Sequence, residues 1–461
     1  MKKRLLLIED EHDIAQIIAS RLENHGFEVN QAHSGKEALK FIQTNEIDLI
    51  LLDVFMPDAN GYELAKQLKE NPKTAGVPIV MLTADSSQED KVKALKSHVD
   101  DFINKPFIEE ELVARLEALL RRSETKQMKK SIINILITGG AGFIGSYLAK
   151  RLIEDNYHVH ILDDFSTGRM ENLEEIKDSE YFHLTTGSVT DEVLVSKLIE
   201  KCDYVYHLAA TVGVKNVVDN PLDTIIYDVI GSEIVLKYAS AKGIRVLLTS
   251  TSEVYGKTTQ LPFTESSDIV LGPPDINRWS YACSKLLDEF LAMAYYRQRN
   301  LQVSVVRFFN IVGPRQLGEY GMVIPRFFNS AIKNEPIYVY GDGEQSRCFT
   351  YVEDAVDIII KLANTDDAYG QVVNLGSNNE IKIKDLAKKV KEISNSQSEI
   401  IFEPYEKYYG KSFQDIRRRV PDVTKLKNLI GSVPTTTMDD IINKMNQHYQ
   451  GNPIELMKVV S

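Results

Sequence analysis

Tyr281 and Lys285 are the two residues of this sequence best suited to acid–base chemistry. They are four positions apart, so a helix would present both on one face. A lysine ammonium beside a phenol favours the phenolate, and lowering a tyrosine pKa from about 10 to near 7 takes about 4 kcal/mol. A phenolate could take a proton from a substrate hydroxyl while hydride leaves the same carbon. Residues 249–256 (TSTSEVYG) add hydroxyl groups and the carboxylate of Glu253 at the end of a predicted strand.

A glycine-rich segment, TGGAGFIG at residues 138–145, follows an apolar run and opens a helical pattern. Its glycines Gly139, Gly142 and Gly145 would permit a tight turn and the close approach of a pyrophosphate to a helix N-terminus. Asp163 and Asp164 end the next apolar run, and Asp163 lies 24 residues after Gly139. This spacing is typical of an acid that binds the adenosine ribose hydroxyls and disfavours a 2′-phosphate. The pattern therefore predicts NAD rather than NADP.

Polar residues also follow the apolar runs near the N-terminus. They are Glu9 and Asp10 after residues 5–8, Asp53 after residues 49–52, Thr83 after residues 80–82, and Lys105 before Pro106. Carboxylate oxygens are the ligands that Mg²⁺ prefers, while a lysine and a hydroxyl could contact phosphoryl oxygens. The sequence therefore predicts an acidic pocket for Mg²⁺ and a phosphoryl group at the carboxyl ends of the strands.

The elements that must position these residues are short apolar runs alternating with amphipathic stretches. The runs are residues 5–8, 49–52, 77–82 and 102–103 in the first part, and 132–137, 158–162, 204–208, 246–249 and 303–308 in the second. Such runs are typical of buried parallel strands with helical crossovers, so we predict a doubly wound α/β fold in both parts. The charged residues 123–131 are interpreted as a linker between domains 1–122 and 132–461.

The composition indicates a globular chain of two or three domains: 461 residues, 43% hydrophobic and 26% charged. The net charge of −12 argues against a nucleic-acid partner. No run approaches the roughly 20 apolar residues of a membrane span, so we expect no membrane partner. Cys202, Cys283 and Cys348 are too few and too scattered for a disulfide framework or a zinc site. Without a signal-peptide pattern, we expect a cytoplasmic protein with reduced thiols.

The first part resembles the receiver domain of two-component response regulators, which has a flavodoxin-like fold. The matching segments are IEDE (8–11), LLDVFMPDANGYEL (51–64), MLTA (81–84) and DDFINKPF (100–107). The resemblance implies that Asp53 is the phosphoacceptor and that Thr83 and Lys105 contact the phosphoryl group. It also implies that Mg²⁺ is bound by Glu9, Asp10, Asp53 and the carbonyl of Phe55. The expected partner is a sensor histidine kinase or a phosphotransfer protein.

The second part resembles the extended short-chain dehydrogenase/reductases, which act on nucleotide sugars with a Rossmann fold and a small C-terminal substrate-binding subdomain. The matching segments are TGGAGFIG, LDDFSTG (162–168), YHLAA (206–210), STSEVYG (250–256), YACSK (281–285), RFFNIVGPR (307–315) and YGDGEQSRCFTYVEDA (340–355). The resemblance implies that Thr251, Tyr281 and Lys285 are catalytic. The implied NAD contacts are Gly139, Gly142, Phe143, Ile144, Gly145, Asp163, Asp164, Ala209 and Lys285. The implied substrate contacts are Ser252, Asn310, Arg347 and Arg419, and a homodimer is expected.

The residue at the position of Glu253 helps to distinguish family members that catalyse different reactions. This chain resembles UDP-glucuronate decarboxylases in having the sequence Thr-Ser-Glu before Val-Tyr-Gly. In addition, residues 408–422 (YYGKSFQDIRRRVPD) resemble a segment of a bacterial decarboxylase in which an arginine matching Arg419 is catalytic. We therefore expect decarboxylation of UDP-glucuronate, with Glu253 and Arg419 as catalytic residues. A UDP-hexose 4-epimerase and a nucleotide-sugar 4,6-dehydratase are the alternatives, because dehydratases also read Thr-Ser-Glu.

Overall fold

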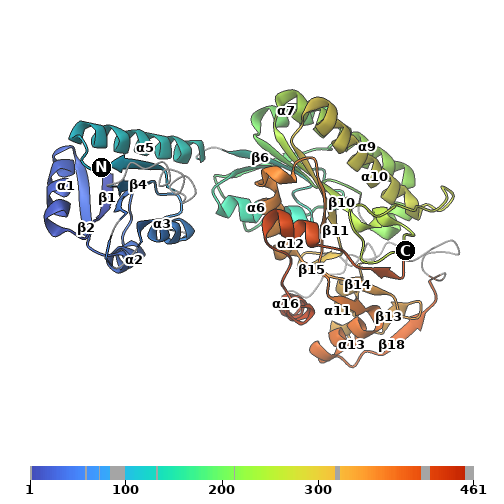
Figure 1. Cartoon of the computed structure of the whole chain (residues 1–461). Helices are drawn as coiled ribbons and strands as arrows, with labels where there is room; N and C mark the ends of the chain where they lie inside the picture. The colour runs from blue at the N-terminus through green and yellow to red at the C-terminus, as the bar shows by residue number, and fades with distance from the viewer. Residues whose placement is uncertain are drawn as a thin grey trace. The chain divides into compact units, whose positions relative to one another are not determined.

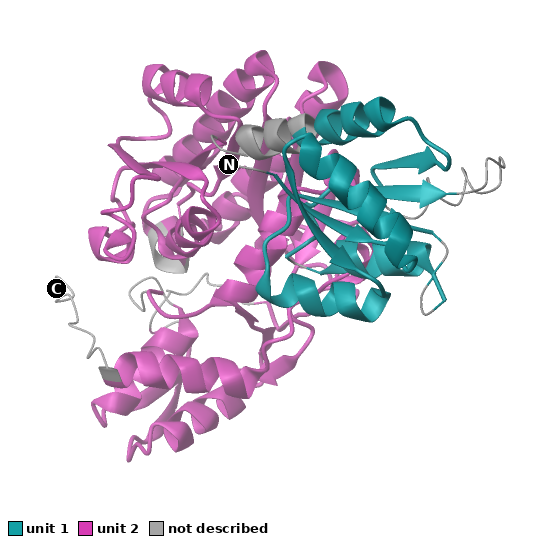
Figure 2. Cartoon of the chain, turned by 90° about the vertical axis from the view of Figure 1, so that its left-hand side faces the viewer, with its two compact units in different colours: residues 1–132 teal, residues 133–461 magenta. Residues whose placement is uncertain are grey.

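The computed structural model divides the chain into two compact units, unit 1 (Met1–Ile132) and unit 2 (Ile133–Ser461), which Figure 2 colours separately. The structure describes residues 3–54, 56–57, 60–71, 73–83, 99–130, 133–211, 213–316, 322–405, 407 and 416–451, with side chains left out for 121–130, 214–216 and 451. In this part of the chain, no helix is long and apolar enough to cross a membrane.

Unit 1 contains one five-stranded parallel sheet in the order β2-β1-β3-β4-β5 (Figure 1). Its strands are β1 (Lys3–Ile8), β2 (Phe27–Ala32), β3 (Leu49–Asp53), β4 (Ile79–Thr83) and β5 (Asp101–Asn104). Its helices are α1 (His12–Asn24), α2 (Gly35–Thr44), α3 (Gly61–Glu70) and α5 (Glu109–Lys130). Helix α5 continues through most of the segment that the sequence predicted as a linker.

The central strands of unit 1 are buried on both faces, and their side chains alternate between two cores. Leu5, Leu7 and Leu49 pack with α1 and α5 on one face, whereas Leu6 and Ile50 pack with α2 and α3 on the other. Uninterrupted apolar runs are therefore needed here, because every position of a central strand points into a core.

Unit 2 is built on a seven-stranded parallel sheet in the order β16-β11-β10-β9-β6-β7-β8. Its strands are β6 (Asn134–Thr138), β7 (His158–Asp163), β8 (Phe182–Thr186), β9 (Tyr204–His207), β10 (Arg245–Thr251), β11 (Val303–Phe308) and β16 (Val372–Leu375). The helices and 3₁₀ turns that accompany it are α6 (Phe143–Glu154), η1 (Met170–Leu173), α7 (Glu192–Lys201), α8 (Val214–Asp219), α9 (Pro221–Lys242), η2 (Ser252–Tyr255), α10 (Arg278–Arg299), α12 (Val352–Ala363) and η3 (Asp366–Ala368).

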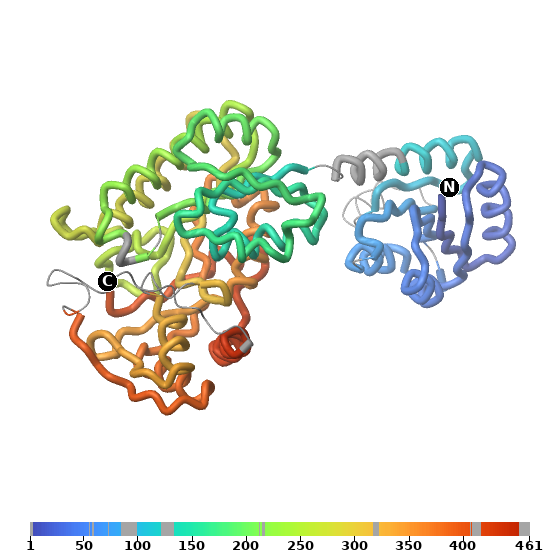
Figure 3. Tube along the Cα trace, turned by 180° about the vertical axis from the view of Figure 1, so that it is seen from behind, coloured from blue at the N-terminus to red at the C-terminus, as the bar shows by residue number. Residues whose placement is uncertain are grey.

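The C-terminal third of the chain, coloured from yellow to red along the trace in Figure 3, adds small sheets and helices to unit 2. The small sheets pair β12 (Ile311–Val312) with β15 (Thr350–Tyr351), β13 (Ile337–Tyr340) with β18 (Ile400–Glu403), and β14 (Ser346–Cys348) with both β17 (Glu380–Lys382) and β19 (Arg418–Arg419). The helices are α11 (Val323–Ile332), α13 (Ile383–Ile393), α15 (Thr424–Ile430) and α16 (Met438–Gly451).

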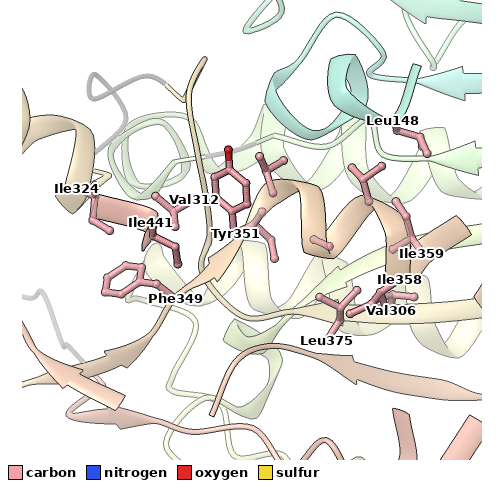
Figure 4. Close-up of a cluster of buried hydrophobic side chains, with 14 of the residues drawn as sticks. Leu148, Val306, Val312, Ile324, Phe349, Tyr351, Ile358, Ile359, Leu375 and Ile441 are labelled. Carbon is pink, nitrogen blue, oxygen red and sulfur yellow. The ribbon is translucent and has the colours of Figure 1, made fainter. Parts of the chain in front are cut away.

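Two cores cover the two faces of the large sheet. One joins it to α6 and α12 and extends into the C-terminal elements, through residues such as Phe349 and Ile441 (Figure 4). The other joins it to α7, α9 and α10. The predicted α/β fold of both parts is confirmed, with parallel strands and covering helices.

Candidate active site and phosphorylation pocket

The glycine-rich loop joins β6 to the N-terminus of α6. Gly139 has a φ of +72°, and a Cβ added to Gly145 would lie 2.2 Å from the Gly139 carbonyl oxygen. A Cβ on Gly139 would lie 2.8 Å from the Ala209 nitrogen, so Ala209 backs the loop. Gly142 precedes α6 and offers no capping side chain, and Phe143 and Ile144 form its first turn. The amides of this turn therefore remain available to an anion, which fits the pyrophosphate of a dinucleotide.

The two acids after β7 have different surroundings. Asp163 is buried and accepts hydrogen bonds from the backbone amides of Ala141 (2.8 Å) and Phe165 (2.9 Å), so it holds the glycine-rich loop in place. Burial raises the pKa of Asp163, although these amides act in the opposite direction. Asp164 is exposed and accepts from the amide of Ser166. Asp164 is therefore the carboxylate that a ligand can reach from solvent, whereas Asp163 stabilises the conformation of the loop.

Helix α10 places Tyr281 and Lys285 beside the end of β10. The Lys285 ammonium is almost fully buried and lies 2.8 Å from the Asp288 carboxylate, which has no exposed surface. The Thr251 hydroxyl is close enough to the Tyr281 phenol to lower its pKa. The structure thus brings Thr251 of β10 together with Tyr281 and Lys285 of α10, two segments that are separate in the sequence.

The pKa of Tyr281 lies well above its ordinary value, because burial and the nearby carboxylates Asp228, Glu253 and Asp288 disfavour the phenolate. The spacing of tyrosine and lysine led us to expect the opposite direction. Burial of the phenol is the largest cause of the difference, and the carboxylates near Lys285 add to it. Burial alone would lower the pKa of Lys285, but Asp288 and Asp228 raise it, so its positive charge is already balanced.

Glu253 lies between two arginines. Its carboxylate is 2.5 Å from Nη1 of Arg419 and 3.2 Å from Nη2 of Arg278. Burial would raise the pKa of Glu253, but Arg419, Arg278 and Arg347 lower it to about 2. Glu253 is therefore a carboxylate at any ordinary pH, and the three guanidinium groups leave this side of the site positively charged.

Two short paired strands position the arginines. Arg347 of β14 and Arg419 of β19 are partners in register, and both are buried. Arg347 donates to the carbonyl of Ser346 (2.8 Å), and the amide of Asn310 donates to the carbonyl of Cys348 (2.9 Å). Ser252 is buried at the start of η2, next to Glu253. A positively charged site of this kind suits a diphosphate or a carboxylate.

The acidic pocket of unit 1 is also assembled. Ligand oxygens of Glu9, Asp10 and Asp53 all lie within 4.8 Å of one another. Lys105 Nζ lies 2.7 Å from both Glu9 and Asp53, and Thr83 ends β4. Within the described residues, the buried Oε1 of Glu9 has no hydrogen-bond partner, and burial raises the pKa of Glu9.

These features of the acidic pocket fit a divalent cation, whose charge would compensate the clustered carboxylates. Phe55, whose carbonyl the resemblance names as a further ligand, lies outside the described residues.

Sequence reasoning missed three residues of the active site: Arg278, Asp228 and Asp288. Arg278 and Asp288 lie three positions from Tyr281 and Lys285 respectively, a spacing that places side chains together on a helix. That spacing could have identified them once α10 was assigned. Asp228 belongs to α9, and no local pattern connects it with α10.

Comparison with known proteins gives matches over both units. A model described as GDP-mannose 4,6 dehydratase matches residues 136–445, and one described as response regulator receiver domain matches residues 5–117. A UDP-N-acetyl-alpha-D-glucosaminuronate decarboxylase of Bacillus cytotoxicus is 39% identical over 316 residues, which cover 68% of this chain and 97% of that protein. UDP-glucuronic acid decarboxylase 1 of Xenopus tropicalis is 35% identical, covering 68% and 72%. The solved dTDP-glucose 4,6-dehydratase of Bacillus anthracis, in complex with NAD, has a TM-score of 0.61 at 26% identity, covering 69% and 97%.

Replacing Gly145 by Ala is expected to weaken dinucleotide binding, since the added Cβ would meet backbone atoms that cannot move independently. We expect NAD affinity to fall by at least about tenfold, equivalent to about 1.4 kcal/mol. Isothermal titration with NAD measures this change. Gly76→Ala is the matched control, because its Cβ would meet nothing within 4 Å. Unchanged affinity in Gly145→Ala would contradict the assignment of this loop.

Proposed function

The chain belongs to the GDP-mannose 4,6-dehydratase family of extended short-chain dehydrogenase/reductases and carries a response-regulator receiver domain at its N-terminus, and on this basis we propose that it is a UDP-glucuronate decarboxylase controlled by phosphorylation. The observation that carries the proposal is the Glu253 carboxylate held between Arg419 and Arg278, close to Tyr281. Curated relatives that match this unit are decarboxylases of UDP-hexuronates by name.

The glycine-rich loop (residues 139–145) would hold NAD, which would supply a hydride acceptor for C4 of the sugar and a hydride donor for the last step. Tyr281 takes the proton of the C4 hydroxyl, with Thr251 orienting the phenol and Lys285 close to it. The resulting C4 ketone is β to the C6 carboxylate. The C5–C6 bond then breaks, CO₂ leaves, and its electron pair passes to the carbonyl as an enolate. After a proton is added at C5, Tyr281 returns its proton to O4 and a UDP-pentose, UDP-xylose, is formed.

Arg419 is the residue proposed to orient the substrate carboxylate. Its buried Nε has no hydrogen-bond partner among the described residues, so it has a donor to offer an anion. Glu253 is a permanent carboxylate whose place beside Arg419 suits proton handling at C5. Arg347, Asn310 and Ser252 are proposed to hold the UDP diphosphate and the sugar.

Proton NMR of the purified protein with UDP-glucuronate is expected to show a UDP-pentose and loss of the hexuronate signals. Parallel tubes contain UDP-glucose and the 2-acetamido hexuronate nucleotide named by the Bacillus cytotoxicus relative. Galactose signals from UDP-glucose with unchanged UDP-glucuronate would make the enzyme a 4-epimerase. A 4-keto-6-deoxy sugar would make it a dehydratase. Glu253→Gln, which keeps the size of the side chain, should slow decarboxylation by at least about 100-fold.

The receiver domain is proposed to be phosphorylated on Asp53 by a sensor histidine kinase or a phosphotransfer protein. Glu9, Asp10, Asp53 and the Phe55 carbonyl are proposed to bind Mg²⁺, and Thr83 and Lys105 to contact the phosphoryl group. Two contacts of Lys105 Nζ, with Glu9 and Asp53, support the proposal. Asp10 lies next to these two carboxylates, and Thr83 is at the end of β4.

Acetyl phosphate with Mg²⁺ is expected to change the turnover of the UDP-sugar by about fivefold or more. A fivefold change is at the lower end of the range that is typical when two sites of a protein are coupled. Phosphorylation is followed on phosphate-affinity gels and turnover by NMR in the same sample. Asp53→Asn removes the phosphoacceptor at nearly constant shape and should abolish the response. Unchanged turnover in a sample shown to be phosphorylated would refute regulation.

A homodimer is proposed to form through the paired helices α9 and α10. Their apolar exposed side chains include Leu222, Ile225, Ile226, Tyr227, Ile230, Leu287 and Phe290. An exposed apolar surface of this extent is typical of an interface. Light scattering should therefore give twice the chain mass for the wild type and the chain mass for Phe290→Asp. Val193→Asp on α7, at a similarly exposed apolar residue, should remain dimeric; a monomeric wild type would refute the dimer.

A further inference from the structure

Strand β19 consists of Arg418 and Arg419, whose side chains have very different exposure. Arg419 is 9% exposed and is the partner of Glu253 in the active site. Arg418 is 56% exposed and forms a bidentate pair with Glu380, in which Nε donates to Oε1 at 2.8 Å and Nη2 to Oε2 at 2.7 Å. Successive residues of a strand point to opposite faces, so the direction of one arginine fixes that of the other. The proposed reaction uses Arg419 but not Arg418.

The pair between Arg418 and Glu380 extends across a three-stranded sheet. The strand order is β17-β14-β19, so Glu380 of β17 and Arg418 of β19 lie on either side of the central strand β14. Ser346 of β14 is the register partner of Arg418, and its hydroxyl donates to the Glu380 carboxylate. The next residue of β14, Arg347, is the register partner of Arg419. The pair therefore links the two strands that carry the buried arginines of the active site.

Strand β19 has little backbone pairing of its own. In the described part of the chain it pairs with β14 over two residues, and the amide of Ser346 donates to the carbonyl of Arg417 at 2.9 Å. A strand that shifts by one residue exchanges the faces of all its side chains. Such a shift would turn Arg419 away from Glu253. The register of β19 therefore decides which arginine enters the active site.

The residues on either side of β19 are held by contacts of other kinds. Before the strand, Nη1 of Arg417 lies 2.8 Å from both carboxylate oxygens of Asp342. After it, the carbonyl of Val420 accepts from the amide of Phe263 at 2.8 Å. Neither contact reaches β17. The pair between Arg418 and Glu380 is therefore the contact that ties β19 to the far strand of its own sheet.

We propose that Arg418 and Glu380 are positioning residues, which set the register of β19 on β14 and thereby hold Arg419 beside Glu253 and the sugar carboxylate. This inference rests on the proposed function, because it takes Arg419 to be the residue that meets the carboxylate of a UDP-hexuronate. Its physical basis is that a bidentate arginine–carboxylate pair restricts direction more than a single contact does. Exposed ion pairs add little to global stability, so the effect is on the arrangement of the site.

The first test follows hydrogen exchange of the Ser346 amide in the full-length protein without substrate. This amide donates to Arg417, so its protection reports the pairing of β14 with β19. In Arg418→Gln it should exchange about threefold faster, within the range that an exposed ion pair can supply. Lys382→Gln is the matched control, because it removes an exposed ion pair with Glu344 (2.9 Å) in the same sheet without involving β19. Its exchange should equal that of the wild type.

The second test measures kcat and KM for UDP-glucuronate by proton NMR. Arg418→Gln should lower kcat by about fivefold or more, because a small displacement of the group that orients the reacting carboxylate is costly. KM should change less than kcat, and Lys382→Gln should leave both unchanged. The double substitution of Arg418→Glu with Glu380→Arg restores the pair in the reverse direction. It should recover most of the protection and of the kcat that either single substitution loses.

Two results would overturn the proposal. One is Ser346 exchange in Arg418→Gln that coincides with that of the wild type and of Lys382→Gln, which would show that the pair does not hold β19. The other is a double substitution with no more protection than the single ones, which would show that pairing is not the property that matters. If the wild type converts no UDP-glucuronate, the proposed reaction fails, whereas the exchange measurement still decides whether the pair sets the register of β19.

Discussion

The parallel order of the strands is the constraint on which both units depend. Every strand of a parallel sheet ends at the same edge, so residues that follow different strands are brought together there. In unit 1 this edge gathers Glu9 and Asp53, and in unit 2 it gathers the glycine-rich loop after β6 and Thr251 at the end of β10. The same order demands that the strands be buried on both faces, which is why helices cover each side of each sheet.

Each site also uses a lysine whose charge is balanced by carboxylates. Lys105 lies 2.7 Å from both Glu9 and Asp53, and Lys285 lies 2.8 Å from Asp288. The burial differs: Lys105 retains about a fifth of its side-chain exposure, whereas Lys285 is nearly inaccessible. A partly exposed lysine can exchange its partner for an arriving anion, while a buried one holds a fixed charge. The first arrangement suits phosphorylation of a neighbouring aspartate, and the second suits control of a proton on Tyr281.

In unit 2 the charge around Glu253, where the substrate is proposed to bind, is opposite in sign to the charge around Lys285. Around Glu253 the arginines are in excess, whereas around Lys285 the carboxylates are in excess. In addition to burial, carboxylates from both groups, Glu253 from the first and Asp228 and Asp288 from the second, raise the pKa of Tyr281. Binding of an anionic sugar nucleotide would compensate the arginines, and binding of a cationic nicotinamide would compensate the aspartates.

The sequence by itself determined the α/β class and the central strands, because apolar runs are local properties of a chain. Fixed spacings in the sequence also pointed to the glycine-rich loop and to Tyr281, Lys285, Glu253 and Asp53 as candidate site residues. The sequence did not reveal the edge strand β8, which is only partly buried and has no continuous apolar run. Only the tertiary structure decided that Glu253 meets Arg419 and Arg278, and that Asp228 of α9 faces Lys285 of α10. Those pairings join segments far apart in the chain. The pKa of Tyr281 depends on them, since the energy of a buried charge is set by its neighbours in space.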